Sequence, residues 1–227
     1  MTPRPGGNRV GLLGGSFNPA HAGHRAITLA AVRALALDEA WWLVSPGNPL
    51  KDGAPDMAPL AARLASARRQ ARLAPIRASD VETRLGTRYT VDTVRALVRR
   101  HPRIRFVWLM GGDNLAQFHR WRDWRGIARA VPIAVVARPG YERVARAAPA
   151  SGWLRRHQRP ARQAKDWTQW SLPALVLLRF RPDPTSATAI RAADPAWSNP
   201  AGAGPAGADP VFAGSGRPVP SFRHPAP

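Results

Sequence analysis

Residues 9–24 read RVGLLGGSFNPAHAGH and combine a strand pattern, a glycine-rich turn and the start of a helix pattern. The short apolar run from Arg9 to Gly14 is typical of a buried strand, and a pattern rich in Ala and Leu, typical of a helix, begins at His21. A turn between such a strand and helix lies at the carboxyl end of the strand, where open α/β sheets bind their ligands. The free N–H groups of the helix N-terminus attract phosphate. The stretch therefore predicts a phosphate-binding turn in an α/β fold.

The rest of the chain repeats this alternation of strand and helix patterns. Further strands are expected at Ala40–Val44, Ile76–Val81, Ile104–Met110, Ile133–Val136 and Ala174–Phe180. Helices are expected at His21–Leu37, Pro59–Leu73, Thr90–Arg100 and Leu115–Ala130. The alternation predicts a Rossmann-like open parallel sheet with helices on both faces.

Two regions depart from this pattern. Residues 148–170 are basic, contain tryptophan and show no clear period, so we expect an insertion or an irregular surface segment. From about Ala193 the chain is dominated by Pro, Gly and Ala, which predicts a disordered tail. We therefore expect an N-terminal extension over residues 1–8, one domain over 9–192 and a tail over 193–227.

The composition excludes some classes of protein and leaves others open. The chain of 227 residues has no cysteine, so it has neither a disulfide framework nor a thiolate zinc site. Its first residues lack the apolar core of a signal peptide, and no segment is apolar enough to span a bilayer, so we expect a cytoplasmic protein. The net charge of +20 suits any phosphate-bearing ligand and does not separate a nucleotide enzyme from an RNA-binding protein.

Two histidines stand at the start of the first helix. His21 and His24 are three residues apart and share a helix face, and Gly23 between them leaves room for a phosphate. Gly14 and Gly15 permit close approach of the backbone to a ligand. Paired imidazoles can donate hydrogen bonds to charge that develops on phosphate oxygens. The alternative is a tight turn whose histidines only cap or pack. The spacing does not suit zinc, so we expect no metal site built from side chains.

A second motif, Ser186-Ala187-Thr188-Ala189-Ile190-Arg191, follows the last expected strand. Ser186 and Thr188 suit a helix N-cap, and the planar fork of Arg191 suits phosphate oxygens. Alone, this pattern favours a plain helix cap. Together with His-x-Gly-His after the first strand, it resembles the nucleotidyltransferase superfamily, which includes adenylyltransferases, cytidylyltransferases and class I aminoacyl-tRNA synthetases. Its adenylyltransferases often have Ser-Ser-Thr here, whereas this chain has Ala187 in place of the second serine.

Five further segments narrow the resemblance. They are NPLK at 48–51, YTVDT at 89–93, WLMGGDN at 108–114, FHRWRDW at 118–124 and RPGY at 138–141. Together they resemble bacterial nicotinate-nucleotide adenylyltransferase, and the resemblance runs from about Arg9 to Arg191. Beyond Arg191 the amphipathic helical stretch usual in that family is missing.

The resemblance implies a role for each matching residue. It makes His21, His24 and Arg191 catalytic. It places ATP against Gly14, Gly15, Ser16, Phe17, His21, His24, Gly111, Asp113, Ser186, Thr188 and Arg191. It places the second substrate against Asn18, Lys51, Thr90, Trp121 and Arg122, with Trp121 stacked on the pyridine ring and backbone N–H groups binding the nicotinate carboxylate. The residues alone leave an alternative for each position. Trp121 fits a core residue equally well, and Thr90 and Asp113 fit helix caps. Lys51 fits a solvated charge on a loop.

The activity implied is transfer of AMP from ATP to nicotinate mononucleotide, with pyrophosphate released and Mg²⁺ bound with ATP. The implied partners are the two nucleotides; we expect neither a membrane nor a nucleic acid as a partner, and the sequence does not predict the oligomeric state. Two alternatives stay open. One is a related adenylyltransferase that accepts nicotinamide mononucleotide or pantetheine phosphate. The other is a basic RNA-binding module that uses the arginines and tryptophans of residues 148–170.

Overall fold

The core of the fold is a parallel sheet. The computed structural model describes residues 8–47, 57–137 and 147–179. Over these ranges seven strands, all parallel, lie in the order β3-β2-β1-β4-β5-β7-β6. The strands are β1 (Asn8–Gly15), β2 (Glu39–Val44), β3 (Ile76–Ser79), β4 (Ile104–Gly111), β5 (Ile133–Ala137), β6 (Gln158–Arg159) and β7 (Leu175–Arg179). The expected Rossmann-like α/β class is confirmed.

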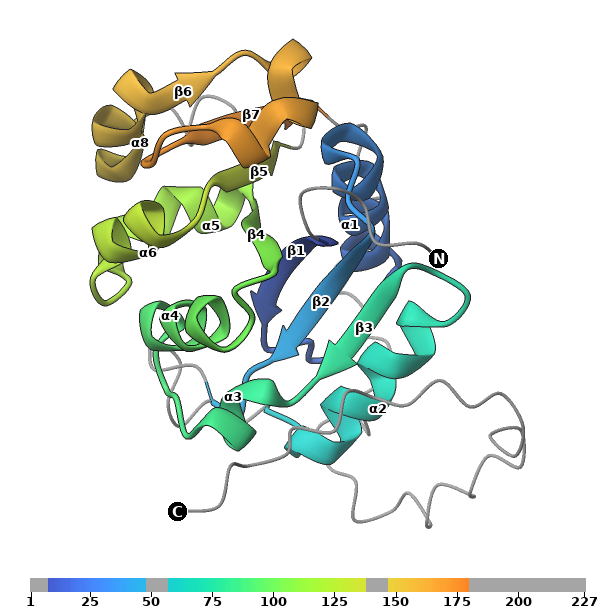
Figure 1. Cartoon of the computed structure of the whole chain (residues 1–227). Coiled ribbons are helices and arrows are strands. Elements are labelled where there is room, and N and C mark those ends of the chain that lie inside the picture. Colours follow the sequence, from blue (N-terminus) through green and yellow to red (C-terminus); the bar gives the residue numbers. More distant parts are fainter. Residues whose placement is uncertain (1–7, 48–56, 138–146, 180–227) are drawn as a thin grey trace.

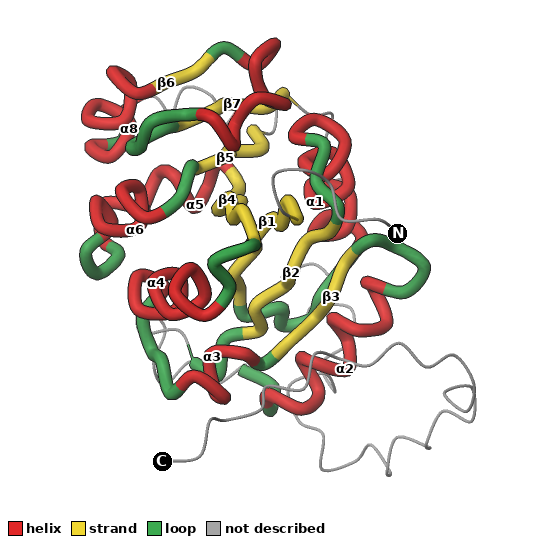
Figure 2. Tube along the Cα trace, in the orientation of Figure 1, coloured by secondary structure: helices red, strands yellow, loops and turns green. Residues whose placement is uncertain are grey.

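Helices cover both faces of this sheet (Figure 1). One face carries α1 (Ala22–Leu35) and α2 (Leu60–Ala71), and the other carries α4 (Thr90–Arg100), α5 (Gly112–Gln117) and α6 (Trp124–Ala130). Shorter helices connect these layers: α3 (Val81–Leu85), α8 (Pro149–Leu154) and the 3₁₀ helices η1 (Phe118–Arg120), η2 (Arg155–His157) and η3 (Ala161–Gln169). Figure 2 shows how the helices flank the strands.

Each face of the sheet has its own apolar core. Alternate residues of β1 and β4, such as Leu12 and Trp108, pack on the side of α4 to α6. Their neighbours Leu13 and Leu109 pack on the side of α1 and α2. Because both faces are covered, these strands read as continuous apolar runs rather than alternating ones.

The chain changes direction across the sheet between β1 and β4. After β1 it builds outward through β2 and β3, and then returns to place β4 on the other side of β1. Leu13 pairs with Leu109 in the register of β1 and β4. Such a switch point opens a crevice at the carboxyl ends of the two strands, which is where doubly wound sheets bind ligands.

The expected helix over Leu115–Ala130 is wrong in one respect, because it is divided into α5, η1 and α6. Asp123 interrupts it with a left-handed backbone (φ 42°), and its carboxylate accepts a hydrogen bond from Gly126 N at 3.0 Å. An Asx cap of this kind competes with a continuous helix. The short elements α3 and β6 were not expected, and most other boundaries differ by one or two residues.

The expectation of an irregular surface segment over residues 148–170 is also wrong. The segment contains α8, η2, β6 and η3, and Trp167 in η3 is fully buried. Its indole Nε1 donates to Leu35 O at the end of α1, at 3.0 Å. The segment is therefore an integral part of the packed fold.

The expected N-terminal extension and C-terminal tail lie almost wholly outside the described residues, so the domain division stays a prediction. Within the described ranges, no helix combines the length and the apolar character that crossing a membrane would need.

Candidate active site

Aromatic packing against the sheet holds the turn that follows β1. Phe17 has a left-handed backbone (φ 49°), which is costly for a residue other than glycine and persists only where packing enforces it. Its buried ring stacks on Trp42 in β2 with 5.0 Å between centroids and tilts against His24 at 4.9 Å. The side chain of Phe17 thus anchors the turn in the core, while the backbone of the turn lies at the edge of the sheet.

Gly14 is required by a close approach between strands. A Cβ added there would lie 2.7 Å from Cη2 of Trp108, in the adjacent strand β4. The glycine therefore lets the Trp108 indole lie directly against β1.

His21 and His24 cap the helix whose N-terminus they occupy. Nδ1 of His21 accepts from Gly23 N at 3.1 Å, and Nδ1 of His24 accepts from His21 N at 3.3 Å, so the two form a reciprocal capping box. The capping alternative is therefore correct as far as Nδ1 is concerned. Because Nδ1 accepts a hydrogen bond in each ring, the neutral imidazole carries its proton on Nε2. The ring centroids are 3.9 Å apart, so two rings that each carry an Nε2–H donor in the neutral form lie side by side.

A relay of hydrogen bonds fixes His24 to the sheet. Thr28 Oγ1 donates to His24 O at 2.7 Å and accepts from Trp42 Nε1 at 2.9 Å. Thr28 and Trp42 are fully buried, so the relay is shielded from water and holds the first turn of α1 against β2.

The end of β4 carries Gly111 and Asp113. Gly111 is the N-cap of α5, and Asp113 lies exposed in the first turn of that helix. The carboxylate of Asp113 folds back over the strand end, because a Cβ added at Gly111 would overlap its Oδ1. Asp113 therefore lies at the carboxyl edge of the strand that adjoins β1, and its contact with a ribose stays a prediction.

The residues expected to bind the pyridine lie on the opposite face of the sheet from α1. Thr90 is the first residue of α4, with Tyr89 as N-cap. The guanidinium of Arg122 lies over the Tyr89 ring at 4.5 Å from its centroid and 3.9 Å from a carboxylate oxygen of Asp92. The structure therefore brings the start of α4 and the Trp121-Arg122 segment together, although about thirty residues separate them in the chain.

Trp108 joins this group to the turn after β1. Its ring makes an edge contact with Trp121 at 6.1 Å, and Phe118 makes another with Trp121 at 5.4 Å. Trp121 is half-buried, so part of its ring remains exposed. Sequence analysis missed the role of Trp108, because an aromatic residue within a buried strand is indistinguishable there from any core residue.

Glu82 is a second residue that the sequence analysis missed. It is buried between the end of β2 and the start of α4, and burial raises the pKa of its carboxyl group to about 7. Hydrogen bonds with Ser45 and with Thr93 Oγ1 (3.4 Å) only partly oppose this shift. Its Oε2 has no hydrogen-bond partner in the described part of the chain.

The side chain of Asn18, an expected substrate contact, binds a backbone N–H group inside the protein. Its Oδ1 accepts from Ala58 N at 3.1 Å, and the residue is buried. Ser16 lies in the same turn and is half-buried. The remaining site predictions, at Lys51, Ser186, Thr188 and Arg191, lie outside the described residues and stay predictions.

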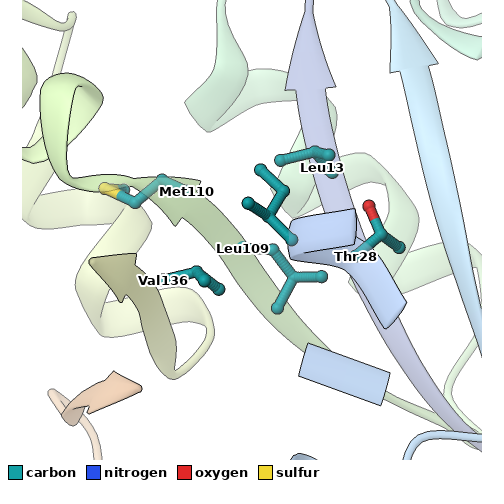
Figure 3. Close-up of a pocket in the computed structure, with 6 residues that line it drawn as sticks. Leu13, Thr28, Leu109, Met110 and Val136 are labelled. Atoms are coloured by element: carbon teal, nitrogen blue, oxygen red, sulfur yellow. The ribbon is translucent and has the colours of Figure 1, made fainter. Parts of the chain in front are cut away.

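The described ranges contain no group of three side chains that could hold a metal ion. They do contain a small apolar hollow of about 160 Å³ between α1 and the ends of β1, β4 and β5 (Figure 3). It is lined by Leu13, Ile27, Thr28, Leu109, Met110 and Val136. Its lining side chains leave essentially no room even for a water molecule, so the hollow does not hold a nucleotide.

Comparisons with known proteins show the family of the chain. Residues 12–193 match the family model described as cytidylyltransferase-like. A protein of Erythrobacter litoralis named "Probable nicotinate-nucleotide adenylyltransferase" is 64% identical over 189 residues, which cover 83% of this chain and 86% of the relative. One of the same name from Parvibaculum lavamentivorans is 54% identical over 191 residues, covering 84% of this chain and 93% of the relative.

A solved structure shares the fold. It is described as Plasmodium falciparum nicotinic acid mononucleotide adenylyltransferase complexed with NaAD, and it aligns with a TM-score of 0.58 over 82% of this chain and 83% of its own. At 14% identity, this likeness supports the fold alone.

Proposed function

Because this chain belongs to the nicotinate-nucleotide adenylyltransferases of the cytidylyltransferase-like family, we propose that it transfers AMP from ATP to nicotinate mononucleotide. The products are nicotinate adenine dinucleotide and pyrophosphate. The observation that carries this reading is the paired cap of His21 and His24 at the end of β1, because it makes two Nε2–H donors at a helix N-terminus.

The reaction needs positioning and charge stabilisation rather than a base. A 5′-phosphate oxygen of the mononucleotide attacks the α-phosphorus of ATP in line. The new P–O bond forms as the bond to pyrophosphate breaks. The attacking phosphate is already anionic at neutral pH, so no side chain has to remove a proton. His21, His24 and the N-terminus of α1 donate hydrogen bonds to the phosphate oxygens, where negative charge shifts during transfer.

The acceptor lies on the other side of the switch point. The exposed part of the Trp121 ring stacks on the flat pyridine, and the N-terminus of α4 at Thr90 offers backbone N–H groups to the nicotinate carboxylate. The guanidinium of Arg122 lies over the Tyr89 ring and so holds the Trp121-Arg122 segment against the start of α4. Asp113, at the end of β4, binds the ribose of ATP between the two faces.

Mg²⁺ accompanies the phosphates of ATP in this proposal. Triphosphate-bound Mg²⁺ generally keeps several water ligands, so the proposal needs no dedicated cage of side chains. Bound with ATP, the ion would supply charge neutralisation for the triphosphate. The protein contributes the donors at His21 and His24.

Pyrophosphate release tests the function directly. Wild-type protein with ATP and Mg²⁺ is expected to release pyrophosphate much faster with nicotinate mononucleotide than with nicotinamide mononucleotide. Equal release with both substrates, or faster release with nicotinamide mononucleotide, would contradict the assigned acceptor and keep only the adenylyl transfer. Salt-sensitive RNA binding without turnover of either nucleotide would overturn the enzymatic proposal.

His24→Ala tests the role of the paired cap. Loss of a preorganised donor is expected to lower kcat by roughly two orders of magnitude, while thermal unfolding shows a folded protein. His157→Ala is the matched control, because His157 lies in η2 beside Trp153, outside the proposed site. Near-normal turnover of His24→Ala would contradict the assigned role.

A further inference from the structure

Arg63 is a buried arginine whose hydrogen bonds within the described ranges all go to backbone carbonyl groups. It lies in the first turns of α2 with 1% of its surface exposed. Its Nε donates to Ala58 O at 2.8 Å, and its Nη1 donates to Ser16 O and to Ser45 O, both at 2.7 Å. Its Nη2 donates to Pro46 O at 3.1 Å. One side chain thus binds four carbonyl oxygens from three separate segments.

The charge of Arg63 has no carboxylate partner among the described residues. Burial lowers the pKa of Arg63, but an arginine still remains protonated near neutral pH. A buried charge without an ionic partner is costly. The four hydrogen bonds to carbonyl oxygens offset this cost, and an apolar side chain would leave those oxygens without their donor.

Three of the carbonyl groups that Arg63 binds lie at the carboxyl edge of the sheet, beside the turn proposed to bind the phosphates. Ser16 lies in the phosphate-binding turn, and Ser45 and Pro46 follow β2, next to that turn. Ser45 N also donates to Gly15 O at 3.0 Å. The guanidinium therefore bridges the turn on the ATP side and the loop that leads toward Lys51.

The same face of α2 fixes the far end of the turn. Ser66, one turn after Arg63, accepts from Ala20 N through its Oγ at 3.1 Å, and Ala58 N donates to Asn18. The turn is consequently held at Ser16, Asn18 and Ala20 by a single helix and the residues that lead into it.

Binding of the carbonyl oxygens also orients the N–H groups of this edge. In a trans peptide the C=O and N–H bonds point in opposite directions. Because Ser16 O and Pro46 O face Arg63, the N–H groups of Phe17 and Gly47 are directed away from it. The guanidinium thus compensates the negative ends of these dipoles, which would otherwise repel a phosphate.

We propose that Arg63 is a positioning residue for adenylyl transfer, which sets the phosphate-binding turn against the loop after β2 and places beneath both a positive charge that pairs with no carboxylate of the described residues. The inference rests on the proposed function and extends it to a residue that touches neither substrate. It acts through the backbone of Ser16, Ser45 and Pro46.

Arg63→Lys is the main test, because lysine keeps the charge but lacks the planar fork that reaches several carbonyls at once. Misalignment of the turn is expected to lower kcat with nicotinate mononucleotide by roughly 10²-fold. The rise in Tm produced by ATP and Mg²⁺, measured without acceptor, is expected to shrink. This rise compares each protein with itself, so a general loss of stability does not produce the result.

The controls separate positioning from folding. Arg68→Lys, on the exposed face of the same helix, is expected to behave as wild type in both measurements. In Arg63→Ala, added guanidinium ion at millimolar concentration is expected to restore part of kcat by occupying the vacated site. Wild-type kcat and an unchanged ATP-induced rise in Tm in Arg63→Lys would overturn the proposal.

The two proposals fail in different ways. If wild-type protein shows the ATP-induced rise but turns over neither acceptor, the proposed function fails, and a reduced rise in Arg63→Lys still supports the positioning role. If wild-type protein shows no ATP-induced rise at all, the positioning role is overturned as well.

Discussion

At the scale of single residues, Glu82 makes the stability of the fold depend on pH. Its carboxyl group has a pKa of about 7 in the folded protein, against 4.5 in the unfolded chain. The folded state therefore binds a proton more tightly, so the contribution of Glu82 to stability is complete below pH 4.5 and is lost as pH rises through 7.

Glu82→Gln removes this dependence. Between pH 5 and pH 8 the wild-type free energy of unfolding is expected to fall relative to the variant, by up to about 3 kcal/mol. Urea unfolding of both proteins at the two pH values measures the difference, in which other titrating groups cancel. The same pH dependence in both proteins would show that Glu82 does not titrate in this range.

The residues that the sequence predicts well are those whose partners lie nearby in the chain. His21 and His24 share a face through helical spacing, so the pair was recognisable before the structure was known. Arg63 and Glu82 find their partners through folding: Ser16 lies 47 residues from Arg63, and Thr93 lies 11 residues from Glu82. No local pattern marks such residues, because a buried charge looks like a surface charge until its neighbours are known.

At the scale of elements, β1 and β4 are coupled by the contact between Gly14 and Trp108. Gly14→Ala would place a methyl group 2.7 Å from a buried ring that cannot retreat. Overpacking of this kind is expected to cost about 1–3 kcal/mol. In a Trp108→Phe background the smaller ring leaves room at Cη2, so the same change is expected to cost much less.

A double-mutant cycle on urea unfolding measures this coupling. The two single variants, the double variant and wild type supply the four free energies. If the two changes in the free energy of unfolding simply add, β1 and β4 are not energetically coupled through this contact.

The strands and most helices could be predicted because each depends on a local pattern. Strands covered on both faces read as apolar runs, and Thr90–Arg100 begins and ends where expected. The division of the helix before Ala130 could not be predicted, since it depends on Asp123 adopting a left-handed cap, and Asp123 also pairs with Arg95 from α4 at 2.8 Å. This tertiary contact favours the divided helix over a continuous one.

At the scale of the whole molecule, residues 148–170 supply the edge strand β6 and pack against the sheet beside β7. The Trp167 ring is buried against the apolar core, its Nε1 binds Leu35 O, and Arg9 lies over it at 5.5 Å. Trp167→Ala is expected to lower the free energy of unfolding by about 3–5 kcal/mol, whereas kcat and KM well below Tm stay unchanged. Gln169→Ala, at an exposed position of the same helix, is the control. A large loss of kcat in folded Trp167→Ala would place this segment within the catalytic machinery.

The switch point between β1 and β4 also has a consequence for how such enzymes diverge. Under the proposed function, the histidine pair acts from the side of α1 and the pyridine-binding residues act from the side of α4 to α6, and each side has its own apolar core. Substitutions separated by more than about 7–10 Å combine almost independently. Selection can therefore remodel the acceptor side for a new molecule while the ATP side keeps its chemistry, so that one ancestral scaffold can give rise to enzymes of different metabolic routes.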